Sequence, residues 1–95
     1  MNNENVKSNI VEKIVSGGQE RITSKELSKL FRVKDSVVRK AVNVARRNGI
    51  PICSSPKGYY YSECNEDIIQ TIKSLKHRIT DIQGAVDGLQ QSLEV

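Results

Sequence analysis

The strongest constraint on the fold of this 95-residue chain lies near its C-terminus, where apolar residues recur in alternating steps of four and three. They are Ile68, Ile72, Leu75, Ile79, Ile82, Val86, Leu89 and Leu93. This heptad spacing places all of them along one narrow stripe of an α-helix. Asn65, which can cap a helix, and the acidic residues after it are typical of a helix start. We therefore predict one long helix from about residue 65 to about residue 93.

A stripe this narrow is typical of a helix that packs against another helix. About 30 residues of helix would extend roughly 45 Å, beyond a domain of this size. Three of the four residues at the heptad a positions are β-branched, which favours a parallel dimer, whereas isoleucine at two d positions leaves a trimer or a tetramer open. Charged residues at e and g are few, so antiparallel pairing stays open. We predict a homo-oligomer, with a dimer first and a tetramer as an alternative; otherwise the helix folds back on its own domain.

Charge divides the chain into two parts. Residues 21–57 contain ten basic residues against Glu26 and Asp35, a net charge of +8, within a total of +4 for the whole chain. From residue 65 onward, three basic residues stand against five acidic ones, a net charge of −2. A basic middle with an acidic C-terminal part predicts a polyanionic partner for the middle.

Helical spacing of apolar residues predicts a first helix over about residues 4–16. The residues are Val6, Ile10, Val11 and Ile14. The sequence Ser-Gly-Gly-Gln ends this helix, and a short extended piece is expected around Arg21-Ile22.

A second, short helix is predicted by the sequence Thr-Ser-Lys-Glu. Thr23 and Glu26 have the spacing of a capping box, in which the hydroxyl and the carboxylate satisfy free backbone amides at a helix start. The helix that follows, SKELSKLF, is expected to bury Leu27, Leu30 and Phe31.

A third helix is predicted over about residues 35–48, with Asp35 as its cap and Gly49 as its end. At about 100° per residue, the apolar residues fall on one broad side. They are Val37, Val38, Ala41, Val42, Val44 and Ala45. The opposite side carries hydrogen-bond donors, with one more at its edge: Ser36, Arg39, Lys40, Asn43 and Arg47, and Arg46 at the edge. One face is therefore expected to be buried and the other to meet a partner.

Directly after this helix, IPICS and YYYS are two strand-forming segments separated by a turn that contains Pro56 and Gly58. A hairpin this short cannot stand alone, so Ile50, Ile52 and at least one of the three tyrosines are expected to pack back on the helices. Which tyrosines point inward is left open. The tip, SSPKG, carries small hydroxyls, a lysine and a flexible glycine, which suit a phosphate backbone or a minor groove.

Residues 22–62, ITSKELSKLFRVKDSVVRKAVNVARRNGIPICSSPKGYYYS, resemble the winged helix-turn-helix domains of bacterial regulators. The likeness is closest to the N-terminal domain of the biotin ligase-repressors and related small bacterial and phage regulators. It covers about residues 10–62 and is most specific in GIPI and KGYYY. The resemblance implies binding to double-stranded DNA, with Lys57 in the wing and four residues at the groove: Ser36, Arg39, Lys40 and Asn43. No ligand-sensing or catalytic domain is expected after the wing, so biotin chemistry and effector control do not carry over.

Together these patterns predict a mainly α fold with a small β-hairpin: a winged helix-turn-helix domain over residues 1–64, followed by a coiled-coil oligomerisation helix over residues 65–95. The predicted function is sequence-specific binding of double-stranded DNA by a transcriptional regulator. The predicted DNA contacts are Lys25, Lys34, Ser36, Arg39, Lys40, Asn43, Arg46, Arg47, Ser55 and Lys57. Two alternatives remain: a replication or partition accessory protein of a phage or mobile element, and a winged-helix module that docks on a larger protein complex.

Other classes of function find little support in the sequence. Cys53 and Cys64 lie 11 residues apart, and with the single histidine, His77, they match no metal-ligand spacing. No nucleophile with a base, paired carboxylates or phosphate-cradling glycine motif is present, so neither an enzyme nor a cofactor is expected. The absence of a secretory signal and of a long apolar run predicts a cytoplasmic protein that does not enter a membrane.

Overall fold

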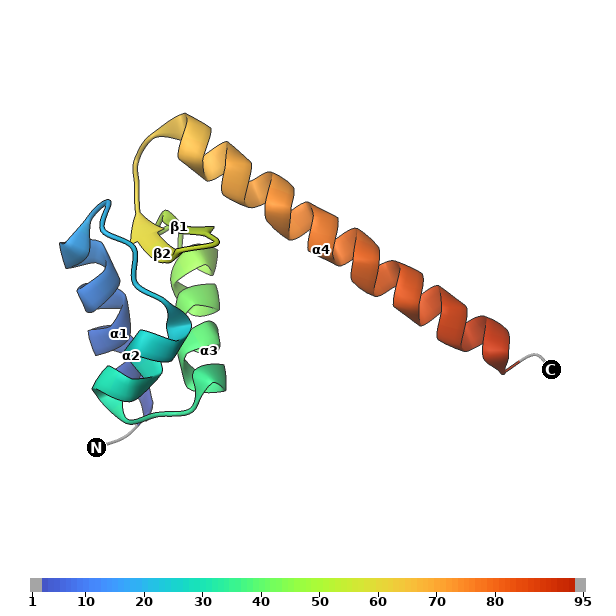
Figure 1. The fold of residues 1–95 in the computed structure, drawn as a ribbon, viewed down its shortest axis with the longest axis horizontal. Coiled ribbons are helices and arrows are strands. Elements are labelled where there is room, and N and C mark those ends of the chain that lie inside the picture. Colours follow the sequence, from blue (N-terminus) through green and yellow to red (C-terminus); the bar gives the residue numbers. More distant parts are fainter. Residues whose placement is uncertain (1–2, 94–95) are drawn as a thin grey trace.

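The computed structural model describes residues 3–93, and in that range the chain is mainly helical with one antiparallel hairpin (Figure 1). The elements are α1 (Asn3–Gly17), α2 (Ser24–Phe31), α3 (Asp35–Arg47), β1 (Ile52–Ser55), β2 (Gly58–Tyr61) and α4 (Asn65–Ser92). Their order and approximate bounds agree with the sequence-based prediction, including the long C-terminal helix. The outer ends of the predicted divisions, residues 1–2 and 94–95, lie outside the described residues.

The core lies between the first three helices and the hairpin. Its buried members come from each of these elements: Val6, Ile10, Ile14, Leu27, Val38, Ala41, Val42, Ala45 and Ile52. The hairpin adds Cys53 and Tyr60, and Ile50 packs against the cluster from the loop before β1. The expected anchoring of the hairpin by apolar side chains is therefore confirmed.

Two apolar residues that were expected to be buried are not. Leu30 is 56% exposed and Val44 is 47% exposed. In α3 the buried residues fall within about 60° of Val38 around the helix axis, whereas Val44 lies about 120° away. In α2 a single turn supplies the contact through Leu27 and Phe31, and nothing covers Leu30. The prediction took the apolar faces as wider than the neighbouring helices can cover.

The start of α2 has the predicted capping box. The Glu26 amide donates to the Thr23 hydroxyl at 3.0 Å, and the Thr23 amide donates to the Glu26 carboxylate at 3.2 Å. The start of α3 differs from the prediction, because Lys34 is the N-cap and no side chain caps the helix. Asp35 instead lies inside the first turn, 3.2 Å from Arg39 one turn later.

The start of α4 is also held differently from the prediction. Cys64 is the N-cap and Asn65 is the first helical residue, without a side-chain cap. Ser62, just before the helix, accepts a hydrogen bond from the Cys64 amide at 3.1 Å and donates one to Asp67 at 2.6 Å. A buried serine outside the helix therefore orders the first turn. The prediction placed the capping residue at Asn65, three positions later.

The hairpin has a two-residue turn, Pro56-Lys57, because Ser55 pairs with Gly58. It is tied to the segment before α2 by a bridge in which Ile22 and Tyr59 exchange two backbone hydrogen bonds of 2.9 and 2.8 Å. The extended piece predicted near residue 22 is thus part of the hairpin's attachment. The backbone approach is so close that a Cβ atom on Gly58 would lie 2.6 Å from the Ile22 carbonyl.

In the described part of the chain, α4 packs against β1 through its first turns. The Thr71 hydroxyl, which is buried, accepts a hydrogen bond from the Ser54 amide of β1 at 3.3 Å. Beyond these turns the helix extends away from the other elements (Figure 1). Along it, the apolar stripe from Ile79 to Leu93 stays 42–83% exposed. The helix therefore does not fold back over its own core. No helix in residues 3–93 has the length and hydropathy needed to cross a bilayer.

Candidate nucleic-acid interface

The outward face of α3 is open to solvent and opposite to its buried face. Val38, Ala41, Val42 and Ala45 are buried, which fixes the rotation of the helix about its axis. The polar residues on the other side are all exposed: Ser36, Arg39, Lys40, Asn43 and Arg47. The structure thus brings together the predicted groove-contacting side chains on one continuous surface, named here the α3 face.

The charge of the α3 face is almost uncompensated. Among the described residues the one ion pair joins Arg39 to Asp35, and both side chains are well exposed, so solvent screens the pair. Lys40 and Arg47 have no acidic partner in the described part of the chain. An anion that meets this surface would therefore displace little more than water and one weak ion pair.

Two further predicted contact residues are lysines outside α3. Lys25 lies in the first turn of α2, and Lys34 lies directly before α3. Both are exposed. The three residues between the two helices, 32–34, give a short connection in which Arg32 adopts a left-handed backbone conformation with φ of 55°.

The hairpin tip carries one exposed cation and one engaged hydroxyl. Lys57 is exposed at the turn. The Ser55 hydroxyl accepts a hydrogen bond from the Lys57 amide at 3.2 Å and donates to the Gly58 carbonyl at 3.4 Å. The predicted contact residue Ser55 therefore also holds the shape of the turn, which orders the backbone that presents Lys57.

Arg46 has a structural role that was not predicted from the sequence. Its side chain is half-buried, and its Nε donates to the Ile52 carbonyl at 2.8 Å, joining the end of α3 to β1. Its Nη2 is buried without a hydrogen-bond partner. Burial, which disfavours the charged form, is the main reason that the pKa of Arg46 is lowered from its usual value. Its predicted contact with a phosphate stays a prediction.

The tyrosines anchor the hairpin, which resolves the register that the sequence left open. Tyr60 is buried and Tyr59 packs partly against the core, while the Tyr61 hydroxyl donates to Glu63 at 2.7 Å. Arg21 covers the ring of Tyr60, with its guanidinium carbon 3.7 Å from the ring centre. The pKa of Tyr60 is raised, first by burial and then by the nearby Asp67 carboxylate.

The predicted oligomerisation residues split into two groups. Ile68 and Leu75 are half-buried and, with Ile72, border an apolar hollow of about 280 Å³ against the loop and strand that follow α3. From Ile79 onward the stripe has no covering residues in the described chain. Leu75, Ile79 and Ile82 also face the α3 face across an open groove that includes Arg39 and Asn43.

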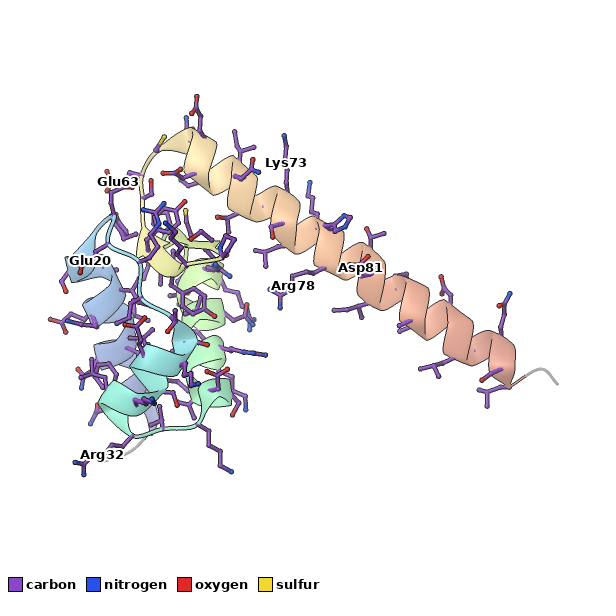
Figure 2. The ribbon with its side chains drawn as sticks, viewed as in Figure 1. Glu20, Arg32, Glu63, Lys73, Arg78 and Asp81 are labelled. Carbon is purple, nitrogen blue, oxygen red and sulfur yellow. The ribbon has the colours of Figure 1, made fainter. Side chains whose placement is uncertain are left out.

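One cation near this surface was missed by the sequence analysis. Arg78 of α4 projects back toward the hairpin (Figure 2). Together with Arg46 and Ser55 it lines a second hollow, which is separate from the apolar hollow beside Ile68 and Leu75. It was overlooked because it lies in the net-acidic C-terminal part, and only the placement of α4 brings it beside the basic middle. Its g position in the heptad was the available signal, since g residues lie beside the seam rather than opposite it.

The described residues contain no group of three potential metal ligands. Cys53 is buried and Cys64 is exposed, and neither forms a disulfide. The chemistry that the surface offers is hydrogen-bond donation and positive charge. No protein-family model matches the chain, and no curated protein matches it in a similarity search.

Proposed function

We propose that this protein is a homo-oligomeric winged helix-turn-helix protein that binds double-stranded DNA. In this proposal α2 and α3 are the two helices of the motif, α3 enters the major groove, and the hairpin is the wing. The observation that carries the proposal is the α3 face, where donors stand outward on a helix whose opposite side is locked into the core. The adjoining hairpin, with Lys57 at its turn, supports it.

The exposed donors suit different parts of a duplex. Asn43 matches a bidentate contact with adenine, and Arg39 and Lys40 match guanine edges or the phosphates beside them. Lys25, Lys34, Arg47 and Lys57 are exposed and suit phosphates, which give affinity without sequence choice. Arg39 can exchange its exposed pairing with Asp35 for a base at little cost.

The α4 stripe supports the oligomeric part of the proposal. An apolar row of this length that stays exposed in a single chain is costly in water and is relieved when a second helix covers it. A dimer through α4 would bring two α3 faces together, so that a site with two half-sites is expected. A transcriptional regulator is the function that this arrangement serves best, and a replication or partition protein would use the same contacts.

The proposal is tested with the double variant Arg39→Ala/Lys40→Ala. Binding to a fluorescent random-sequence duplex is measured by anisotropy across a range of salt concentrations. We expect loss of at least about 100-fold in affinity at moderate salt, since two charge contacts near the groove are lost. The matched control is Lys13→Ala/Lys73→Ala, which removes two exposed lysines from α1 and α4.

Equal losses in the two double variants would remove the groove assignment, because only the total charge would then matter. Oligomeric state and thermal unfolding of both variants must match the wild type, since Arg39 and Lys40 are exposed and outside the core. A selection of bound sequences from random duplex DNA would then give the half-site spacing.

A second candidate function is favoured by the same exposed stripe. A helix that projects from a small fold suits docking on a larger protein complex as well as pairing with itself. The two functions differ in their response to salt. A steep salt dependence of duplex binding supports the DNA-binding function, and absent binding supports the docking function.

A further inference from the structure

A polar hollow of about 330 Å³ lies where the hairpin, the start of α2 and the side of α4 meet. The lining residues with polar side chains include Ser24, Arg46, Ser54, Ser55, Tyr59 and Arg78. They supply hydroxyl groups and two guanidinium groups, and no carboxylate lines the hollow. Residues from the start of α2, the end of α3, the hairpin and α4 therefore contribute donors and positive charge to one place.

Arg46 has donors to spare at this hollow. A guanidinium carries five N–H groups, and within the described chain only the Nε–H of Arg46 has a hydrogen-bond acceptor, the Ile52 carbonyl. The centre of the Tyr59 ring lies 5.8 Å from the Arg46 guanidinium carbon, and no acidic residue of the described chain pairs with this half-buried charge, so an anion would further offset the cost of its burial. The bond to Ile52 fixes the planar group, so its remaining donors are held in place rather than free to turn into solvent.

Arg78 brings a second charge to the same hollow. It comes from the side of α4 that faces the hairpin (Figure 2), and no acid among the described residues pairs with it. The two arginines are close enough for the charge of Arg78 to contribute to the lowered pKa of Arg46. Two like charges that converge on a space lined by hydroxyls are the arrangement that proteins use for phosphate groups.

We propose that this hollow is a phosphate-binding site, in which Arg78 and Arg46 hold a phosphate of the DNA backbone beside the hairpin. This inference rests on the proposed DNA-binding function and adds α4 to the interface. The same helix would then join two chains and contact the nucleic acid. The hydroxyls of Ser24 and Ser54 border the site and match the remaining oxygens of a phosphate.

The test uses the full-length chain with Arg78→Gln, and Lys76→Gln as its matched control. Lys76 and Arg78 lie two residues apart on α4, at the e and g positions on either side of the stripe, and only Arg78 lines the hollow. Arg46 is not used, because its bond to Ile52 makes it part of the fold. For Arg78→Gln we expect the slope of log affinity against log salt to fall by about 0.9 and the affinity to fall several-fold. Lys76→Gln should leave the slope unchanged.

A second measurement separates the sources of the phosphate. The melting temperatures of wild type and both variants are compared in inorganic phosphate and in chloride at equal ionic strength. If the wild type binds DNA and the two variants have equal slopes, the site is overturned while the DNA-binding function stands. If the wild type ignores DNA, but phosphate raises its melting temperature and not that of Arg78→Gln, the site binds free phosphate and the proposed function fails. If neither response occurs, both are overturned.

Discussion

The first part of this chain buries most of its apolar side chains, whereas the outer part of α4 leaves them exposed. In residues 3–64, apolar residues from three helices and the hairpin are fully buried around Ile10 and Val38. In α4 beyond Leu75 the apolar residues lie in an equally regular pattern, yet they remain exposed. The pattern alone therefore does not separate a helix that completes a core from one that needs a partner. The width of the stripe and the length of the helix do.

The contrast extends to polar contacts. The first part is closed by specific hydrogen bonds, such as the Ile22–Tyr59 bridge and the capping box at Thr23. The outer part of α4 is held by bonds within the helix itself, such as that from the Gln83 side chain to Asp87 at 2.9 Å. The first part contains the buried core, while the outer part of α4 has only contacts within the helix and depends on helix propensity.

The largest effect is expected from a charged residue in the exposed apolar row of α4. Ile82→Asp places a charge in the middle of the apolar row, where pairing of two helices would bury it. We expect the dissociation constant of the oligomer to rise at least about 100-fold, which corresponds to about 3 kcal/mol. Sedimentation equilibrium measures this change, and the unfolding of the core in residues 3–64 should be unaltered.

The control for this variant is Ile69→Asp, since Ile69 is half exposed and lies outside the alternating row. A wild-type chain that is monomeric at high micromolar concentration would contradict the oligomer. An equal effect of the two substitutions would show that the interface is not the row from Ile68 to Leu93.

The features that the sequence predicted best depend on residues that lie close together in the chain. The capping box at Thr23 and Glu26, the end of α3 near Gly49 and a hairpin turn that includes Pro56 depend on neighbours in the chain, and they were predicted, although Gly58 belongs to β2 and not to the turn. The polar residues of the α3 face were also predicted, because a single helical period sorts them.

The errors have two causes, the placement of other elements and the choice between local partners. Leu30 is exposed because it lies on the side of α2 away from the core, and Asp35 pairs with Arg39 of its own helix instead of capping α3. At α4, Ser62 organises the first turn from outside the helix, so Asn65 has no capping bond. Arg78 joins the basic surface only through the direction in which α4 leaves the hairpin. The exposure of Leu30 and the position of Arg78 do not follow from spacing along the chain, whereas the Asp35–Arg39 pair and the Ser62 bonds join residues within five positions and were missed because the caps were assigned from residue type alone.

The next largest effect is expected in residues 3–64, where the hairpin backbone approaches the segment before α2. In Gly58→Ala the new Cβ would lie 2.6 Å from the backbone of Ile22, at a residue whose φ is +129°. Something must shift there, so we expect a loss of at least about 2 kcal/mol in the free energy of unfolding. Urea denaturation measures it. Gly49→Ala is the control, because φ is +84° there but the space around it is open. A loss no larger than that of Gly49→Ala would mean that the hairpin does not press on the segment before α2.

The smallest effect is the same substitution on α4, and its sign is opposite. Gly84 lies at an f position, away from the apolar row, and a Cβ added there meets nothing within 4 Å. Alanine exceeds glycine in helix propensity by about 1 kcal/mol, so Gly84→Ala should raise the melting temperature of α4 and of the proposed oligomer. Circular dichroism at 222 nm follows the transition at several protein concentrations, since pairing makes it concentration-dependent. A loss of stability would show that another chain approaches α4 closely at Gly84. The partner would then lie on a side of the helix other than the exposed apolar row, and the contrast between the two ends of the chain would need a different explanation.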